Sequence, residues 1–183
     1  AAICDYETCF TRELRRDRVG RPAADEERDA APLASPSCFA QTLDWLLCDG
    51  LPRLGAPDGD SLYRRLSTRP VDQSPFLAAA ERIGTESLRA DVLAGGYRLR
   101  EPALVGAPRV VLASCGAVLP EAFHAAEALE SEGIAATVLD VVSPDRLYRG
   151  WRDELRSASH DVRRADLGAI HLASLITPDE RRA

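Results

Sequence analysis

The chain has 183 residues, of which 45% are hydrophobic, so it is long enough to bury one substantial core or two small ones. Its net charge of −6 argues against nucleic acid as a partner, because phosphate binding requires a basic surface. All 23 basic residues are arginine, which excludes Schiff-base chemistry on a lysine and a lysine phosphate anchor within this chain.

The sequence carries no signal for a membrane or for export. No apolar run approaches the ~20 residues that span a bilayer, and no charged-then-apolar leader begins the chain. The five cysteines are irregularly spaced without a C-x-x-C pair, and only three histidines accompany them, so a structural zinc site is not expected. We expect a cytoplasmic protein whose thiols are reduced and mostly buried: Cys4, Cys9, Cys38, Cys48 and Cys115.

The first 35 residues differ from the rest of the chain. Residues 11–31 contain twelve charged side chains and almost nothing apolar, so this segment cannot bury enough surface to offset the entropy lost on ordering it. We interpret residues 1–35 as a charged N-terminal arm, either a solvated helix or a mobile tail. A docking arm for a partner is the alternative.

A helix is predicted over residues 38–49, with Ser37 as its N-cap and Gly50 at its end. Apolar residues recur in it at helical spacing on more than one face, so much of this helix is predicted to be buried. The residues of this apolar stripe are Phe39, Leu43, Trp45, Leu46, Leu47, Cys48 and Leu51.

A strand is predicted at residues 62–67, after a turn rich in Gly, Pro and Asp. The strand runs directly into Ser-Thr-Arg-Pro, which indicates the end of a domain rather than a strand that continues into a core. From Pro70 to Gly96 the chain is interpreted as a connector that holds two short helices, around 76–83 and 86–94.

The clearest architecture follows this connector. YRLRE is predicted as a short strand, and RVVLAS, residues 109–114, as a buried parallel strand. A helix is expected to open near Pro120 and to stop at Gly133, and IAATVLDVV forms the next strand. The Ser-Pro-Asp triplet at 143–145 caps another helix. Strand, helix and strand in this order imply a βαβ unit with a right-handed crossover.

The predicted fold class is α/β, with a mainly parallel sheet. The last segment holds one possible strand or helix, Ile170 to Ile176, and then ends on a charged turn. Two or three parallel strands make a thin sheet, so this domain is expected to be incomplete. We therefore expect the isolated chain to be marginally stable or oligomeric.

Two residues are weighed as candidates for catalysis. Cys115 follows a predicted parallel strand and precedes Gly116, the position at which α/β sheets place working residues. A nucleophilic cysteine needs a histidine or a helix N-terminus to lower its pKa, and no histidine has a motif-defined relation to Cys115. His124, one turn into the following helix, is the second candidate. Packing at Cys115 and a surface or core position for His124 are the structural alternatives.

Other charged residues give no defined site. His160 and His171 are eleven positions apart, with no i, i+4 partner that would make a metal pair. Arg64, Arg65 and Arg69 could hold a phosphate or a carboxylate, or pair with acidic residues in the flanking turns: Asp58, Asp60 and Asp72. No P-loop, G-x-G-x-x-G or G-x-S-x-G motif is present.

Five stretches taken in order form a recognisable pattern: PSCFAQTLDWLLCDGL, SLYRRLSTRPVDQ, LAGGYRLRE, VVLASCGAVLPEAFHAAEALESEGIAATVLDVVSPDRLYRG and HLASLITPDERRA. Together they resemble the C-terminal part of thiamine-diphosphate enzymes of the transketolase superfamily, nearest to the homodimeric type of pyruvate dehydrogenase E1 component. The resemblance covers about residues 36–183, and residues 1–35 match no part of it.

The resemblance implies a division of the chain. Residues 36–72 would be the end of a pyrimidine-binding-type domain, 73–102 the linker, and 103–183 a truncated transketolase C-terminal-like domain. Enzymes of this family decarboxylate a 2-oxo acid or cleave a ketose through the thiazolium carbon of thiamine diphosphate, with magnesium holding the diphosphate. The segments that carry the activating glutamate and the metal motif have no counterpart here, so no catalytic, cofactor-binding or metal-binding residue is assigned.

These implications lead to two main hypotheses. The chain is a subunit or fragment of a split thiamine-diphosphate enzyme, inactive alone, whose complementary subunit brings the cofactor and magnesium within a hetero-oligomer. Alternatively, it is a non-catalytic interaction or regulatory module derived from the same family. A cysteine-dependent hydrolase built around Cys115 is a third, weaker hypothesis.

Overall fold

The structure is a computed structural model that describes residues 33–54, 62–66, 69–160 and 170–182. The charged segment 11–31, Cys4 and Cys9, and the turn with Asp58 and Asp60 lie outside these residues. The helices and strands in chain order are β1 (Leu33–Ser37), α2 (Ala40–Gly50), η1 (Leu51–Arg53), β2 (Leu62–Leu66), α3 (Ser74–Ile83), α4 (Thr85–Ala94), β3 (Tyr97–Arg100), β4 (Arg109–Ser114), η2 (Gly116–Val118), α5 (Leu119–Ser131), β5 (Ala135–Asp140), α6 (Pro144–His160) and α7 (His171–Leu175).

The larger sheet has three strands in the order β3-β5-β4. Strands β4 and β5 are parallel neighbours, in register from Arg109 opposite Ala135 to Ser114 opposite Asp140. The α/β class is therefore confirmed, together with the predicted strand-helix-strand unit. Strand β3 pairs with β5 in the antiparallel direction, so the sheet is mixed rather than mainly parallel.

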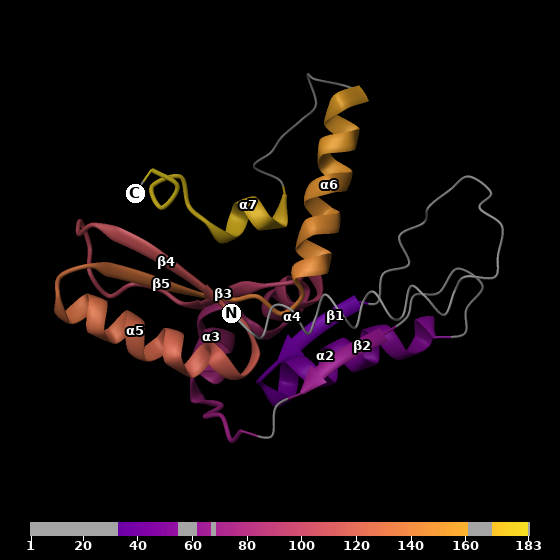
Figure 1. The fold of residues 1–183 in the computed structure, drawn as a ribbon, viewed down its shortest axis with the longest axis horizontal. Coiled ribbons are helices and arrows are strands. Elements are labelled where there is room, and N and C mark those ends of the chain that lie inside the picture. The colour runs from indigo at the N-terminus through magenta and orange to yellow at the C-terminus, as the bar shows by residue number, and fades with distance from the viewer. Residues whose placement is uncertain (1–32, 55–61, 67–68, 161–169, 183) are drawn as a thin grey trace, which may run out of the picture.

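The two faces of this sheet are covered by different helices (Figure 1). Helix α5 packs on one face, where Val138 of β5 joins the main apolar core. On the other face Leu139 packs with Leu147 of α6 and Leu175 of α7. Every residue of β5 is buried, whereas β4 is mostly half-buried. The prediction of a fully buried strand is thus wrong for β4, because among the described strands it pairs with β5 alone.

A smaller sheet consists of β1 and β2, which are parallel. Helix α2 follows β1, and its N-cap Phe39 and its Trp45 belong to the same apolar core as the larger sheet. The ring of Phe76 on α3 lies 5.5 Å from that of Phe39 and 5.7 Å from that of Trp45, measured between centroids. One core therefore joins the first segment to the second, and the division into domains stays a prediction.

The observed helices can be compared with the helices and the N-cap that the sequence predicts. Helices α3 and α4 confirm the two predicted connector helices. The segment Ile170–Ile176, for which the sequence allowed a strand or a helix, contains the short helix α7. Helix α2 begins at Ala40 rather than after Ser37, because Ser37 is the last residue of β1 and pairs with Leu66. The predicted N-cap is therefore wrong, and Phe39 holds that position without a side-chain cap.

Gly95 is required between α4 and β3. Its φ of 120° lies in a region that other residues avoid, and an added Cβ would come within 2.7 Å of the Ser143 carbonyl oxygen. The Ser143 amide donates to the Gly95 carbonyl at 2.8 Å, so the chain before β3 and the chain after β5 meet here at backbone distance. None of the described helices combines the length and the apolar character needed to cross a bilayer.

Candidate functional site

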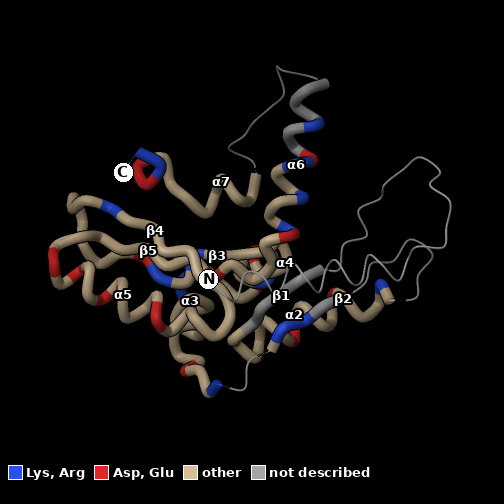
Figure 2. The backbone as a smooth tube through the Cα atoms, viewed as in Figure 1, with Lys and Arg blue, Asp and Glu red and all other residues tan. Residues whose placement is uncertain are grey.

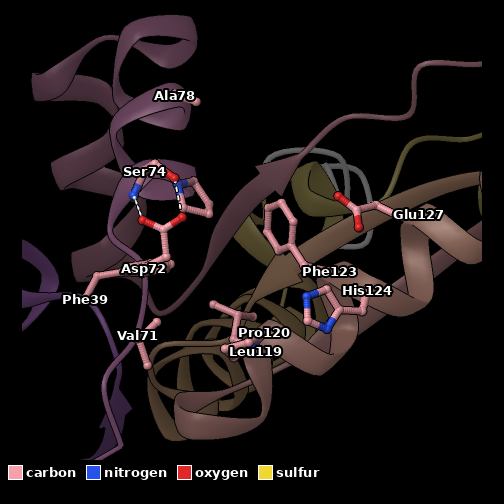
Figure 3. A pocket seen from close by; sticks show the side chains of 11 residues that line it. Phe39, Val71, Asp72, Ser74, Ala78, Leu119, Pro120, Phe123, His124 and Glu127 are labelled. Atoms are coloured by element: carbon pink, nitrogen blue, oxygen red, sulfur yellow. Dashed lines mark hydrogen bonds between the residues drawn. The ribbon is translucent and has the colours of Figure 1, made fainter.

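A groove of about 500 Å³ lies between the segment that enters α3 and the first half of α5 (Figure 3). Its apolar floor includes Phe39, Val71 and Leu119. The volume is within the range of small-molecule sites, which are mainly apolar with a few polar groups at defined positions. The groove is therefore the first candidate for a binding site.

Helix α5 provides one wall of the groove through a single face. Pro120, Phe123, His124 and Glu127 are spaced by three, one and three residues, and side chains three or four positions apart lie on one face of a helix. His124, a candidate from the sequence, is exposed and lies in this wall. The spacing is visible in the sequence, but the opposite wall that turns the face into a groove is not.

The opposite wall contains Asp72, which lies just before the N-cap of α3, Gln73. Its carboxylate accepts hydrogen bonds from the Ser74 amide at 3.0 Å and from the Ser74 hydroxyl at 2.5 Å. These bonds lower the pKa of the Asp72 carboxyl below its ordinary value, so it is negatively charged at neutral pH. Next to it, the Gln73 side-chain oxygen accepts from the Ala40 amide at 2.9 Å and connects this wall to the start of α2.

The charges around the groove are mostly negative. Glu127 has no ion-pair partner among the described residues, and no arginine lines the groove. Arg69 and Glu121 form an ion pair of 2.8 Å between half-exposed side chains, with Glu121 in the first turn of α5. Arg69 therefore pairs with Glu121 and not with Asp72, whose carboxylate accepts hydrogen bonds from Ser74. The other two partners offered by the sequence, Asp58 and Asp60, lie outside the described residues.

A second polar cluster lies at the carboxyl ends of β4 and β5. Asp140 ends β5 between Tyr97 of β3 and Ser114 of β4, and is 3% exposed. Burial raises the pKa of Asp140 to about 7, and the neighbouring Tyr97 hydroxyl opposes this rise in part. The Tyr97 hydroxyl itself is buried and makes no hydrogen bond to any described residue.

The three described cysteines are free thiols in different surroundings. Cys38 is half-buried, and burial and then Asp140 raise its pKa to about 12, so it is a protonated thiol. Cys48 and Cys115 are exposed, so the prediction of buried thiols is wrong for these two, while Cys4 and Cys9 lie outside the described residues. Cys115 lies after β4 as expected, and it is close enough to Cys38 to add to the rise in that residue's pKa. The sequence analysis missed Asp140, because an aspartate at the end of a predicted strand is usually a solvent-exposed residue of the following turn.

The other histidines and arginines hold elements together. The His171 Nε2 lies 2.7 Å from the Gly96 carbonyl oxygen, and its Nδ1 lies 3.8 Å from Asp91. Arg64 donates to the Leu46 carbonyl at 2.8 Å, which supports the structural alternative for this residue. Arg65 is exposed. The side chain of His160 lies outside the described part of the chain.

Within the described ranges, no group of three or more His, Cys, Asp or Glu side chains has a geometry that could hold a metal ion. Arg64, Arg65 and Arg69 do not form one anion site either, since Arg64 and Arg69 have the separate contacts given above. No protein-family model and no curated protein sequence matches this chain.

Proposed function

We propose that the chain is one part of a split thiamine-diphosphate-dependent enzyme of the transketolase type. It contributes the end of a pyrimidine-binding-type domain, a linker and a transketolase C-terminal-like domain. A complementary subunit holds thiamine diphosphate and magnesium. The reaction class is decarboxylation or dehydrogenation of a 2-oxo acid, or transfer of a two-carbon ketol group.

The observation that carries this proposal is the order of the elements after β2. Strand β2 ends at Leu66, and the segment 69–73 then leads to α3 and α4. A single antiparallel strand, β3, and the parallel β4-α5-β5 unit follow. This sequence of a strand end, a connector and a βαβ unit agrees with what the resemblance implies for the crossing from one domain to the next.

The described residues do not fit the cofactor. They bring together no set of carboxylates, thiols or imidazoles that could hold a magnesium ion, and the groove between α3 and α5 contains no arginine for a diphosphate. No catalytic step is therefore assigned to this chain, and cofactor binding belongs to the partner in this proposal.

Titration with thiamine diphosphate and Mg²⁺ by calorimetry tests the proposal. The three samples are this chain alone, a candidate partner that carries a Gly-Asp-Gly motif and a glutamate-bearing segment, and the complex of the two. We expect the complex to bind the cofactor more tightly than the partner alone, and this chain alone to bind none. Failure of every reconstituted complex to bind the cofactor would refute the enzymatic role, and binding to this chain alone would refute the assignment to the partner.

The alternative function is a non-catalytic interaction or regulatory module. It is favoured by the groove, in which apolar side chains dominate and His124 is exposed without a described hydrogen-bond partner. In that case a complex would form, but the partner would bind the cofactor with the same affinity whether or not this chain is present. The same calorimetric comparison therefore separates the two functions.

A further inference from the structure

We propose that the groove between α3 and α5 binds a small apolar cation, such as an aromatic or alkyl amidine, guanidine or amine. This site is independent of the proposed enzyme, because it uses only residues of this chain. Three features carry the inference: the shape of the groove, the sign of its charges and the positions of its carboxylates.

The shape favours a ligand with an apolar body. A half-open space of about 500 Å³ lies between the two walls. Its accessible apolar surface comes from lining residues that stay partly exposed, whereas Phe39 and Leu119 are buried beneath it. The partly exposed residues are Val71, Pro75, Ala78, Pro120 and Phe123. Figure 3 shows Phe123 and His124 on the α5 side and Asp72 with Ser74 on the α3 side, with open space between them. An apolar group that enters this space removes hydrophobic surface from water on both walls.

The charges favour a cation over an anion. Asp72 and Glu127 lie on opposite walls, and His124 is the other titratable residue in the lining. Helix α5 carries carboxylates and no arginine along its length (Figure 2). The N-terminus of α3 does not reverse this sign, because Asp72 already accepts from its Ser74 amide.

Asp72 and Glu127 differ in how much hydrogen-bond acceptor capacity they have left for a ligand. Each Asp72 oxygen already accepts one hydrogen bond from Ser74, whereas Glu127 is exposed and has no described ion-pair partner. Glu127 is therefore the main acceptor for an incoming N–H donor, and Asp72 adds negative potential from across the groove. A cation held between them also lies near the Phe123 ring, whose face attracts positive charge.

Three ring compounds of similar size test the sign of the charge. Benzamidine is a cation, benzyl alcohol is neutral and benzoate is an anion, and each is titrated into the full chain while amide shifts are followed by NMR. We expect benzamidine to bind at least about tenfold more tightly than benzoate, with benzyl alcohol between them, and to shift amides of residues 71–78 and 119–127. Equal or tighter binding of benzoate, or no saturable benzamidine shift in these segments, would overturn the proposal.

Variants separate the charge from the apolar surface. Glu127→Gln should weaken benzamidine binding about three- to tenfold, the range of a partly exposed charge-assisted hydrogen bond, and leave benzyl alcohol unchanged. Phe123→Ala should weaken both compounds. Glu132→Gln, an exposed glutamate at the end of α5 and outside the groove, is the matched control and should change neither. If Glu132→Gln weakened benzamidine binding as much as Glu127→Gln, the assignment of the binding site to this groove would be wrong.

Discussion

The carboxyl group of Asp140 is buried, and no positively charged side chain among the described residues pairs with it. The side chain is 3% exposed, and its neighbours in the sheet are Tyr97 and Ser114. A buried carboxylate without a positive partner is disfavoured, so the folded protein keeps this group protonated well above the ordinary carboxyl range. Its nearby titratable groups, Tyr97 and Cys38, are uncharged at neutral pH, because burial raises the pKa of each.

This environment predicts that the contribution of Asp140 to stability falls as pH rises. The pKa of Asp140 is raised from 3.8 to about 7 in the folded state, so its contribution is fully present below about pH 4, is lost progressively toward pH 7, and stays lost above it. A difference of about three pKa units corresponds to about 4 kcal/mol. Asp140→Asn, which cannot ionise, should therefore be more stable than the wild type at pH 8 and of similar stability at pH 4.

Urea unfolding of both proteins at pH 4, 6 and 8 measures this difference. Asp179→Asn, which alters an exposed carboxylate near the end of the chain, is the control and should follow the wild type at all three values. If Asp140→Asn followed the wild type equally closely, Asp140 would not be the buried acid that the structure describes.

At the scale of elements, the segment after α7 is fixed to the sheet by one buried carboxylate. Arg98 of β3 binds Glu180 through two hydrogen bonds of 2.8 and 2.9 Å, and Thr137 of β5 donates to the same carboxylate at 2.5 Å. Burial alone would raise the pKa of Glu180, but these bonds and those from Thr177 outweigh it and hold the pKa well below its ordinary value. The contribution to stability is therefore present above pH 4.5 and is lost as pH falls further.

Arg98→Met should destabilise the protein by about 3 to 5 kcal/mol, because it leaves the fully buried Glu180 charge without its partner. Glu180→Gln should cost less, since the amide oxygen still accepts from Thr137. Combining both changes should cost less than the sum of the single effects. Urea unfolding gives these values, and faster hydrogen exchange at residues 170–182 locates the change. Arg89→Met, at an exposed arginine of α4, is the control, and an equal loss there would contradict the prediction.

The same elements show what the sequence can predict. Helices α3 and α4 follow from glycines and apolar spacing, since Gly84 and Gly95 have positive φ at the helix ends. The pairing of β3 with β5 in the antiparallel direction does not follow from spacing, because it depends on contacts between residues about 40 positions apart. Arg98 and Glu180 are 82 positions apart, and each alone resembles a surface charge. Of the α5 wall of the groove, the sequence analysis singled out His124 alone, and the opposite wall depends on how the chain before α3 is placed against α5.

At the scale of the whole molecule, the main apolar core joins the α2 segment to the larger sheet. Asp49 of α2 and Arg146 of α6 form an ion pair of 2.6 Å, and Arg146 also donates to the Leu93 carbonyl. The β1-α2 segment is thus connected to the larger sheet by both apolar and charged contacts. We infer that these parts unfold together in the isolated chain, because separating them would expose Phe39, Trp45 and Phe76 at once.

Helix α6 extends away from this core (Figure 1) and carries an exposed aromatic pair. Tyr148 is 54% exposed and Trp151 39% exposed, their ring centroids are 5.8 Å apart, and Arg152 lies over the Tyr148 ring. Exposed tyrosine, tryptophan and arginine side chains in contact are typical of protein interfaces. The isolated chain should therefore self-associate as its concentration rises.

A double variant, Tyr148→Ser with Trp151→Ser, should weaken this association by removing the apolar surface that two copies would bury. Light scattering over a range of concentrations measures it, together with binding of a hydrophobic dye, which should also decrease. Leu77→Ser is the matched control, because Leu77 on α3 is 59% exposed but belongs to no aromatic pair. A wild-type chain that stayed monomeric at its highest soluble concentration would contradict the prediction, and an equal effect of Leu77→Ser would show that association depends on general hydrophobicity rather than on α6.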